Sequence, residues 1–392
     1  MIGQQRAIAL AGIAFGVLTF WAALPPWTAR NIAYPLILGV LAVACGLAAV
    51  GLGDRRYGWW AVTAGFVGTV GGLWAQGVEQ ATLEAVLTAG LVASTLRFAT
   101  PLAFAAIGGI FSERSGVVNI GLEGMMLVGA FFAVWGSIWS GSWVVGIAMA
   151  MLSGGLLAFI HGVFSIHLRA DQIVSGFAVN LLALGLTGYL YSSIYPGGTP
   201  TDKVDRVPEL ALGFLGGVPG VGDFLETAFG GLSVLVWVML VVVILAYVAL
   251  FKTPIGLRIR SVGEHPRAAD TVGISVYWVR YAAVVTSGVL AALGGAFLSI
   301  GFTGRFAENM TSGRGFIALA AVIFGKWRPG WTFVATLLFG FGFALAIPLQ
   351  READISSNVI STLPYILTLV AVAGVIGRSI PPAAIGRPYV KQ

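Results

Sequence analysis

The sequence is poor in charge. Only 10% of its 392 residues are Asp, Glu, Lys or Arg, whereas 58% are hydrophobic. An ordinary soluble domain carries about 25% charged residues, and a mean hydropathy of +0.92 leaves too little polar surface to cover a water-soluble globule of this size. These values exclude a cytosolic enzyme and a secreted domain. The lipid bilayer is therefore the solvent for most of the chain.

Residues for covalent or metal chemistry are also scarce. Cys45 is the only cysteine, which excludes a disulfide framework and a cysteine-based metal site. The three histidines are too scattered for a zinc-binding helix. A phosphate-binding loop is missing, because Gly325-Lys326 is followed by Trp327, and so is a Gly-x-Ser-x-Gly nucleophile elbow. We expect no catalytic residues, no metal site and no ATP hydrolysis by this chain.

Apolar runs and glycine are plentiful instead. The 55 glycines are about twice the usual share, and small residues let membrane helices approach closely. The pattern predicts an all-α, polytopic membrane protein of about 10–12 transmembrane helices. The expected spans are residues 8–24, 32–52, 58–75, 98–118, 125–139, 143–166, 173–195, 231–251, 280–302, 331–349 and 360–377, with a twelfth piece at 315–326 that is too short to span comfortably.

The few basic residues predict the orientation. A cluster of them lies in one predicted loop: Lys252, Arg258, Arg260, Arg267 and Arg280. Cytoplasmic loops are enriched in Lys and Arg, and alternating outward from this loop places 15 of the 22 basic residues on the same side. Both termini are then predicted to be cytoplasmic. The pI of 9.6 reflects topology, and we expect no nucleic-acid partner.

Arg97 interrupts a nearly continuous apolar stretch. An arginine at the bilayer centre costs at least about 2.5 kcal/mol. We therefore expect Arg97 at the outer interface, with residues 82–96 as a helix lying along the membrane and a span beginning near Phe98.

Two glycine-rich interruptions stand out, one in each half of the chain. Residues 112–124 separate two apolar runs by fewer residues than a relaxed loop would use, and a helical segment there would place Asn119 and Glu123 on one face. Residues 304–328 combine a similar interruption with the short apolar piece 316–324. Such pairs of broken or short helices are typical of inverted repeats in transporters. A solvated cytoplasmic turn is the alternative for the first of them.

Polar residues also open a later span. Asp171 and Gln172 precede it and could be interfacial caps, whereas Asn180 lies about two turns further in. Unsatisfied polar groups cost several kcal/mol in hydrocarbon, so such residues are functional candidates by default.

The loop 252–280 admits two interpretations. Pro266 suits the first position of a short helix over Arg267 to Val272, lying outside the bilayer. The loop could be basic only for topology, or it could dock a soluble partner.

Three stretches carry a family resemblance. They run from Ala99-Thr100-Pro101-Leu102 to Glu123-Gly124-Met125-Met126, from Thr253-Pro254-Ile255-Gly256 to Arg267-Ala268-Ala269, and from Gly313 to Gly325. They resemble the permease subunits of ATP-binding cassette (ABC) importers of the branched-chain amino acid and simple sugar group. The resemblance is closest to the nucleoside-type permeases that work with basic-membrane-protein lipoproteins. The resemblance implies a permease core over residues 81–392, preceded by additional transmembrane helices over 1–80. His265 departs from the pattern, because an Asn is usual there.

The resemblance also implies an assembly in a bacterial cell (inner) membrane. Its partners would be ATPase subunits that use ATP and Mg, a second homologous permease forming a heterodimer, and an extracytoplasmic solute-binding lipoprotein. This chain would bind no cofactor. Coupling to the ATPase would fall on Gly263, Glu264, His265, Pro266, Arg267, Ala268 and Ala269 within the segment 252–280. The solute path would fall on Asn119, Glu123 and Asn180, with Asp171 and Gln172 beside them.

The expected function is therefore that of a transport subunit for nucleosides or related ribose-containing solutes. Simple sugars are the nearest alternative. An ion-coupled secondary transporter would place coupling carboxylates in mid-span, and only Glu123 and Asp171 approach that condition.

Overall fold

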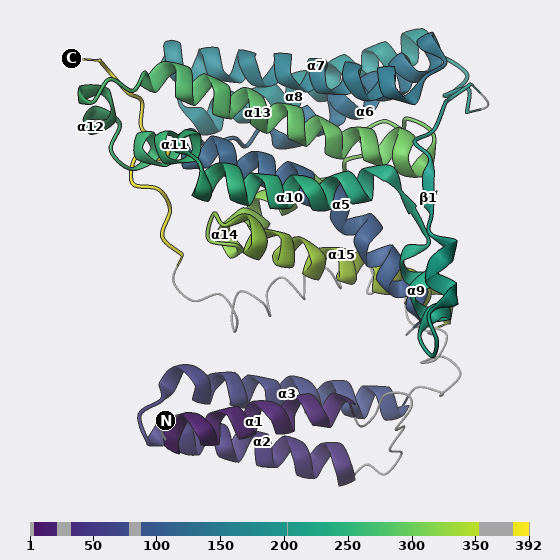
Figure 1. The fold of residues 1–392 in the computed structure, drawn as a ribbon, viewed down its shortest axis with the longest axis vertical. Coiled ribbons are helices and arrows are strands. Elements are labelled where there is room, and N and C mark those ends of the chain that lie inside the picture. Colours follow the sequence, from purple (N-terminus) through teal and green to yellow (C-terminus); the bar gives the residue numbers. More distant parts are fainter. Residues whose placement is uncertain (1–3, 22–32, 78–87, 202, 353–378, 392) are drawn as a thin grey trace. The chain divides into compact units, whose positions relative to one another are not determined.

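The computed structural model describes residues 4–21, 33–77, 88–201, 203–352 and 379–391. Helices dominate these ranges (Figure 1), and eight of the helices are long and apolar enough to cross a membrane. The prediction of an all-α, polytopic membrane protein is confirmed. The chain divides into two compact units, residues 1–91 with 345–377 and residues 92–344 with 378–392. The expected span 360–377 lies outside the described residues.

Within the described part of residues 1–77, the first unit forms three helices, α1 (Gln4–Trp21), α2 (Ala33–Gly51) and α3 (Arg55–Gly77). Arg6 at the start of α1 pairs with Asp54 in the turn between α2 and α3, with 3.7 Å between Nε and Oδ2. The start of α1 therefore lies near the end of α2, and the three helices alternate in direction. Glycine permits the contact between α1 and α3: a methyl group at Gly16 would lie 2.5 Å from the carbonyl carbon of Ala64. A small residue thus lets the backbones of α1 and α3 approach closely, as is common between membrane helices.

The second unit begins with four long helices. They are α5 (Ala89–Arg114), α6 (Leu122–Ser140), α7 (Trp143–Gly162), which continues into the π-helical turn η1 (Val163–His167), and α8 (Gln172–Ile194). Their bounds follow the predicted apolar runs except at the start of α5. There the prediction of a separate helix that ends at residue 96 is wrong, because α5 runs unbroken from Ala89 through Arg97. Residues 82–87 of the predicted helix lie outside the described residues, and the position of Arg97 at the outer interface stays a prediction. The guanidinium donates to the carbonyl of Gly231 at 2.6 Å and lies 3.9 Å from a Glu209 carboxylate oxygen, so the helix does not have to break.

A small hairpin stands at one end of this unit. Strand β1 (Glu209–Ala211) pairs antiparallel with β2 (Gly231–Ser233), in register Glu209 to Ser233. Between them lie the short 3-10 helix η2 (Gly213–Gly217) and α9 (Gly222–Phe229). Figure 1 shows β1 and α9 at the end of the helices opposite α11 and α12.

The remaining helices complete the second unit. They are α10 (Val234–Lys252), α11 (Pro254–Glu264), α12 (Pro266–Thr271), α13 (Val276–Ala296) with the π-helical turn η3 (Phe297–Thr303), α14 (Arg314–Phe324) and α15 (Pro329–Glu352). Helix α14 has 11 residues, about 16 Å at 1.5 Å per residue, against a hydrocarbon core of about 30 Å. It is too short to span alone, as predicted.

Helix α13 is the centre of this unit. A methyl group at Gly129 of α6 would lie 2.5 Å from the Cα of Ala292, and one at Gly154 of α7 would lie 2.7 Å from the carbonyl oxygen of Gly288. The helices α6, α7 and α13 therefore touch through their backbones.

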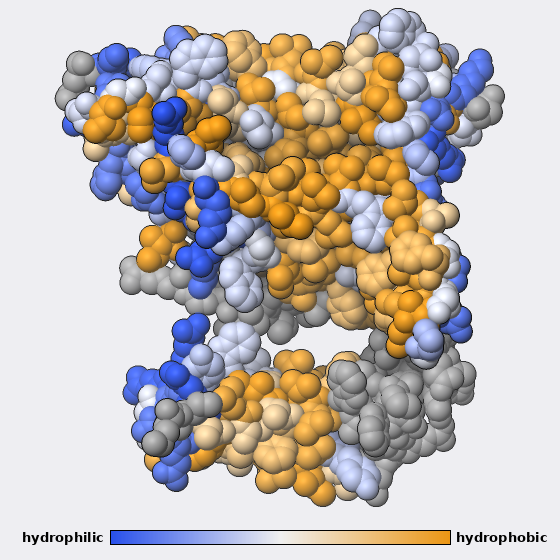
Figure 2. All heavy atoms as spheres, viewed as in Figure 1, coloured by the Kyte–Doolittle hydropathy of each residue, from blue (hydrophilic) through white to orange (hydrophobic). Residues whose placement is uncertain are grey.

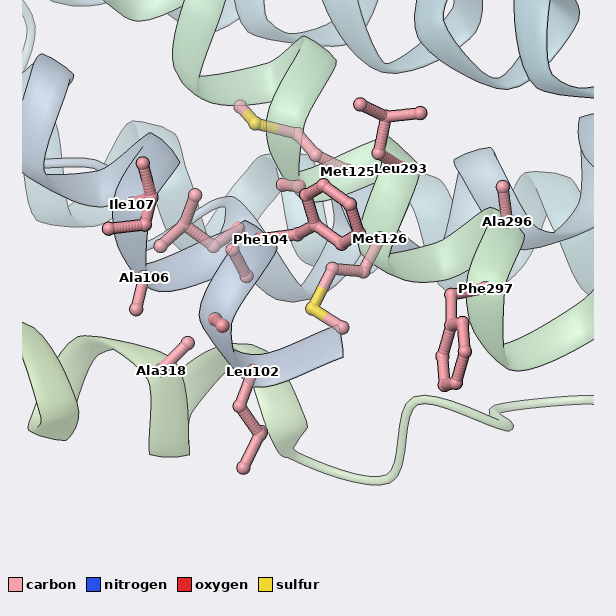
Figure 3. Close-up of a cluster of buried hydrophobic side chains, with 14 of the residues drawn as sticks. Leu102, Phe104, Ala106, Ile107, Met125, Met126, Leu293, Ala296, Phe297 and Ala318 are labelled. Atoms are coloured by element: carbon pink, nitrogen blue, oxygen red, sulfur yellow. The ribbon is translucent and has the colours of Figure 1, made fainter. Parts of the chain in front are cut away.

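Large side chains fill the space between α5, α6 and α13. Figure 3 shows Phe104, Met126 and Leu293 in this core, with Ala318 of α14 at its edge. Outside it, the side of the second unit seen in Figure 2 carries an apolar band with hydrophilic residues at both ends. This is the surface of a protein embedded in a bilayer.

Candidate functional site

The turn between α5 and α6, residues 115–121, is held by side chains from distant helices. The Val118 N–H donates to Oε1 of Gln172 at 2.7 Å, and Nε2 of His161 lies 3.0 Å from the Val118 carbonyl oxygen. The other ring nitrogen of His161 lies 2.9 Å from the Ser175 hydroxyl. The two backbone polar groups of Val118 are therefore bound from two helices, the carbonyl from α7 and the N–H from α8.

Two asparagines hold the rest of the turn. Asn119 is fully buried and donates through Nδ2 to the Ser287 hydroxyl of α13 at 2.9 Å. Asn180 of α8 accepts from the Gly124 N–H at 2.8 Å and donates to the Ile120 carbonyl at 3.0 Å. The two bonds of Asn180 satisfy backbone groups that the break between two helices leaves without partners.

Glu123 joins the two glycine-rich interruptions. Its carboxylate accepts from the N–H of Gly313 at 2.7 Å and from the N–H of Gly315 at 2.6 Å, at the start of α14. A negative charge is favourable at a helix N-terminus, where N–H groups lack partners within the helix. Gly315 is required for this approach, since a methyl group there would lie 2.5 Å from the Cα of Glu123.

The segment from Gly304 to Phe324 connects the two ends of the second unit. At one end the Thr199 hydroxyl donates to the Phe306 carbonyl. At the other, past the end of α14, Nε of Arg114 donates to the Trp327 carbonyl at 3.1 Å. Residues 304–313 form bends and turns, and the short helix α14 follows them.

The structure brings together four of the five predicted path residues, namely Asn119, Glu123, Gln172 and Asn180. Asp171 is exposed, and its carboxylate accepts from the N–H groups of Ile173 and Val174 as the N-cap of α8. Asn119 and Glu123 do not share a helix face, because Asn119 lies in the turn and Glu123 in the first turn of α6. Oδ1 of Asn119 and Nε2 of Gln172 are buried and have no hydrogen-bond partner among the described residues.

The predicted coupling segment contains two helices rather than one. Thr253 caps α11, its hydroxyl accepting from the Gly256 N–H, and Pro254 occupies the first turn. His265 separates α11 from α12, which begins at Pro266 and ends one residue before the predicted Val272. The single short helix expected there was therefore only the second of the pair.

The seven proposed coupling residues differ in how far they are exposed. Gly263 and Ala269 are buried, Pro266 is half-buried, and Glu264, His265, Arg267 and Ala268 are exposed. Gly263 packs directly on the carbonyl of Arg114, which leaves no room for a side chain. The exposed set is available to a partner, while Gly263 fixes the segment to the end of α5.

Several residues at this end were not anticipated. Glu113 is buried and accepts a hydrogen bond from the Trp327 indole. Arg280, counted in the sequence as a loop residue, lies inside α13 with only 1% of its surface exposed, and donates to the Ser115 carbonyl at 3.2 Å. His161 is one of the three scattered histidines, and no local sequence pattern indicates its contact with Val118.

Within the described ranges, no group of three or more His, Cys, Asp or Glu side chains could hold a metal ion. The polar side chains of this site bind mainly backbone atoms.

Residues 91–372 match a family described as "Branched-chain amino acid transport system / permease component". The guanosine ABC transporter permease protein NupQ of Bacillus subtilis is 45% identical over 316 residues, covering 77% of this chain and 96% of that protein. The nucleoside ABC transporter permease protein NupC of Lactococcus lactis is 40% identical over 313 residues, covering 77% and 97%.

A putative glucose ABC transporter permease protein of Haloferax volcanii, TsgC13, is 32% identical over 314 residues, covering 74% of this chain and 93% of that protein. Bacillus subtilis and Lactococcus lactis each have a second, more distant relative that is also named a guanosine or nucleoside permease. No solved structure matches the chain. The relatives named here are transport components rather than enzymes.

Proposed function

This chain belongs to the family of branched-chain amino acid transport system permease components, and we propose that its solute is a nucleoside. The chain is a multi-pass ABC transporter permease of a bacterial cell membrane. The observation that supports a nucleoside as the solute is the sequence identity of 45% and 40% to two permeases named for guanosine and nucleosides, over 96% and 97% of their lengths. A glucose-type solute is the second candidate, supported by the relative from Haloferax volcanii at 32%.

We propose that the chain works with ATPase subunits at the end formed by α11 and α12. ATP and Mg are used by those partners. The second permease is a homologue rather than a copy, which the paired permeases of two organisms support. An extracytoplasmic lipoprotein delivers the solute. Residues 1–80 are additional membrane helices outside the family match, which begins at residue 91.

The solute path, in this proposal, passes the two interruptions that meet at Glu123. Asn119, Asn180 and Gln172 border it, and Asp171 lies at the start of α8. The support is that the four clustered residues surround the place where helices break, and that Asn119 and Gln172 retain unused polar atoms. Ribose hydroxyls and base edges can pair with such amide groups.

The test is uptake by cells of the source organism from which this gene has been deleted. Uptake of radiolabelled guanosine should fall to background and return with the wild-type gene, and depletion of ATP should abolish it. Loss of glucose uptake with nucleoside uptake intact would favour the sugar candidate. Uptake that survives ATP depletion but stops when ion gradients collapse would overturn the ABC mechanism.

A further inference from the structure

Residues 379–391 form a strap across the end of the second unit where α11 and α12 lie (Figure 1). The Ala384 N–H donates to the Gly263 carbonyl at 2.9 Å, and the Gly386 N–H donates to the Gly116 carbonyl at 3.2 Å. The strap is thus bonded through its backbone both to the end of α11 and to the turn 115–121.

Side chains fasten the strap as well. Nη1 of the buried Arg280 donates to the Arg387 carbonyl at 3.1 Å, while its Nε holds Ser115. The Tyr389 ring is 5% exposed and packs edge-on against Tyr277, with centroids 5.7 Å apart. Burial and a hydrogen bond to Asp270 raise the pKa of the Tyr389 hydroxyl above its ordinary value. The strap is an integral part of the fold.

A cavity of about 540 Å³ opens between the strap and the exposed part of the coupling segment. Residues 264–268 form one wall, and residues 383, 384 and 387–390 form the other. The cavity requires both walls. The strap therefore gives the coupling segment a concave surface, which α12 alone would not have.

The unpaired charge of this cavity is positive. Arg267 and Arg387 are exposed, one on each wall, and no carboxylate among the described residues lies within ion-pair distance of either. The carboxylate of Glu264 accepts from the Ala383 N–H at 3.1 Å, so it is already engaged in joining the walls. The guanidinium group of arginine can bind a carboxylate through two parallel hydrogen bonds.

We propose that the strap and α12 together form one seat for the ATPase partner, which inserts a carboxylate-bearing segment between Arg267 and Arg387. This inference rests on the proposed function and adds the strap to it. Because the strap bonds to Gly116, force applied at the seat reaches the turn 115–121 through the strap as well as through Gly263. The turn is followed by Glu123, which holds α14.

The test uses the assembled transporter, purified through a tag on this chain from membranes of the complemented deletion strain. Arg387→Glu should lower the amount of copurified ATPase subunit and the rate of guanosine uptake by about tenfold, since a like charge replaces an attraction. Arg387→Lys should keep most of both. Lys203→Glu, an equal charge reversal in the exposed loop before β1, is the matched control and should change neither.

Failure of the proposed seat and failure of the proposed function give different results. If Arg387→Glu keeps full copurification and uptake while Arg267→Glu loses them, the strap is no part of the seat, although the proposed function survives. If the wild-type chain itself copurifies no ATPase and supports no ATP-dependent uptake, the proposed function fails.

A second measurement does not depend on the stability of a charge variant. In a Cys45→Ser background the chain has no cysteine, and Val390→Cys places one on the exposed rim of the cavity. Maleimide labelling of this thiol should fall at least about fivefold when the ATPase is assembled, because contact excludes the reagent. Equal labelling with and without the ATPase would overturn the seat, and so would protection that persists after the ATPase is removed, which would indicate a lipid surface instead.

Discussion

At the residue scale, the polar side chains of the second unit act mainly on the backbone. Glu123, Asn180, Gln172 and His161 each bond to a peptide group of a broken helix. In the bilayer core no water is available to form hydrogen bonds with such groups. The residues that mark the candidate path are therefore also those that make the break between helices stable.

Replacing Glu123 should separate the two interruptions. Glu123→Ala leaves two N–H groups at the start of α14 without acceptors and should lower stability by about 2 kcal/mol or more. Glu123→Gln keeps an acceptor oxygen and should fall in between. The midpoint of thermal unfolding in detergent and guanosine uptake provide the readouts. Glu308→Ala, the same change at an exposed position, is the control, and an equal loss in both would contradict the capping role.

A single methyl group tests the same contact from the other side. Gly315→Ala would force its Cβ against the backbone of Glu123, whereas Gly185→Ala in α8 meets nothing within 4 Å. Overpacking of this kind costs about 1–3 kcal/mol. We expect Gly315→Ala to lower the unfolding midpoint and uptake, and Gly185→Ala to leave both unchanged. Wild-type behaviour of Gly315→Ala would show that α14 can move away from Glu123.

Sequence patterns found some of these residues and missed others for a physical reason. Asn119, Glu123 and Asn180 stand out because a polar group between apolar runs is costly. The role of Arg280 depends on Ser115, 165 residues away, and that of His161 on Val118, 43 residues away. No local pattern records a partner at such a distance.

At the element scale, helix bounds follow from apolar length and local caps. The spans predicted from residues 98–302 match helices, because each run is long enough to cross and ends in polar residues or glycine. The predicted helix break before Arg97 is wrong, because the hairpin supplies the Arg97 guanidinium with a carbonyl 134 residues away. It also missed α11, although Thr253-Pro254 is a recognisable helix start.

Helix α12 should be sensitive to charge. We expect Arg267→Glu to reduce ATP-dependent guanosine uptake by about tenfold or more while the chain still inserts in the membrane, since Arg267 is exposed. ATP hydrolysis in the same membranes should no longer respond to the nucleoside. Undiminished uptake by Arg267→Glu would count against docking at α12.

At the scale of the whole molecule, the ends of the second unit differ in chemistry. The coupling helices and the C-terminal strap lie together at one end, and the hairpin with α9 lies at the other (Figure 1). The basic residues counted in the sequence predict that the first end faces the cytoplasm. Which end meets which compartment follows from loop charge and not from the packing of helices.

Single thiols can check this orientation. In the Cys45→Ser background, Gly197→Cys should react with a membrane-impermeant maleimide added to intact cells, whereas Ala170→Cys should react only after the cells are opened. Both positions are exposed and lie outside the proposed seat for the ATPase, so a missing reaction reports the membrane side rather than burial. The reverse pattern would invert the topology.

The backbone contacts of α6, α7 and α13 restrict where a passage can form. Gly129 against Ala292 and Gly154 against Gly288 bring the backbones of these helices into contact, so a gap between them would have to separate backbones that touch. We infer that the three helices move as one block during a transport cycle. The solute path that we propose then runs beside this block, at the two interruptions that meet at Glu123, and not between its helices.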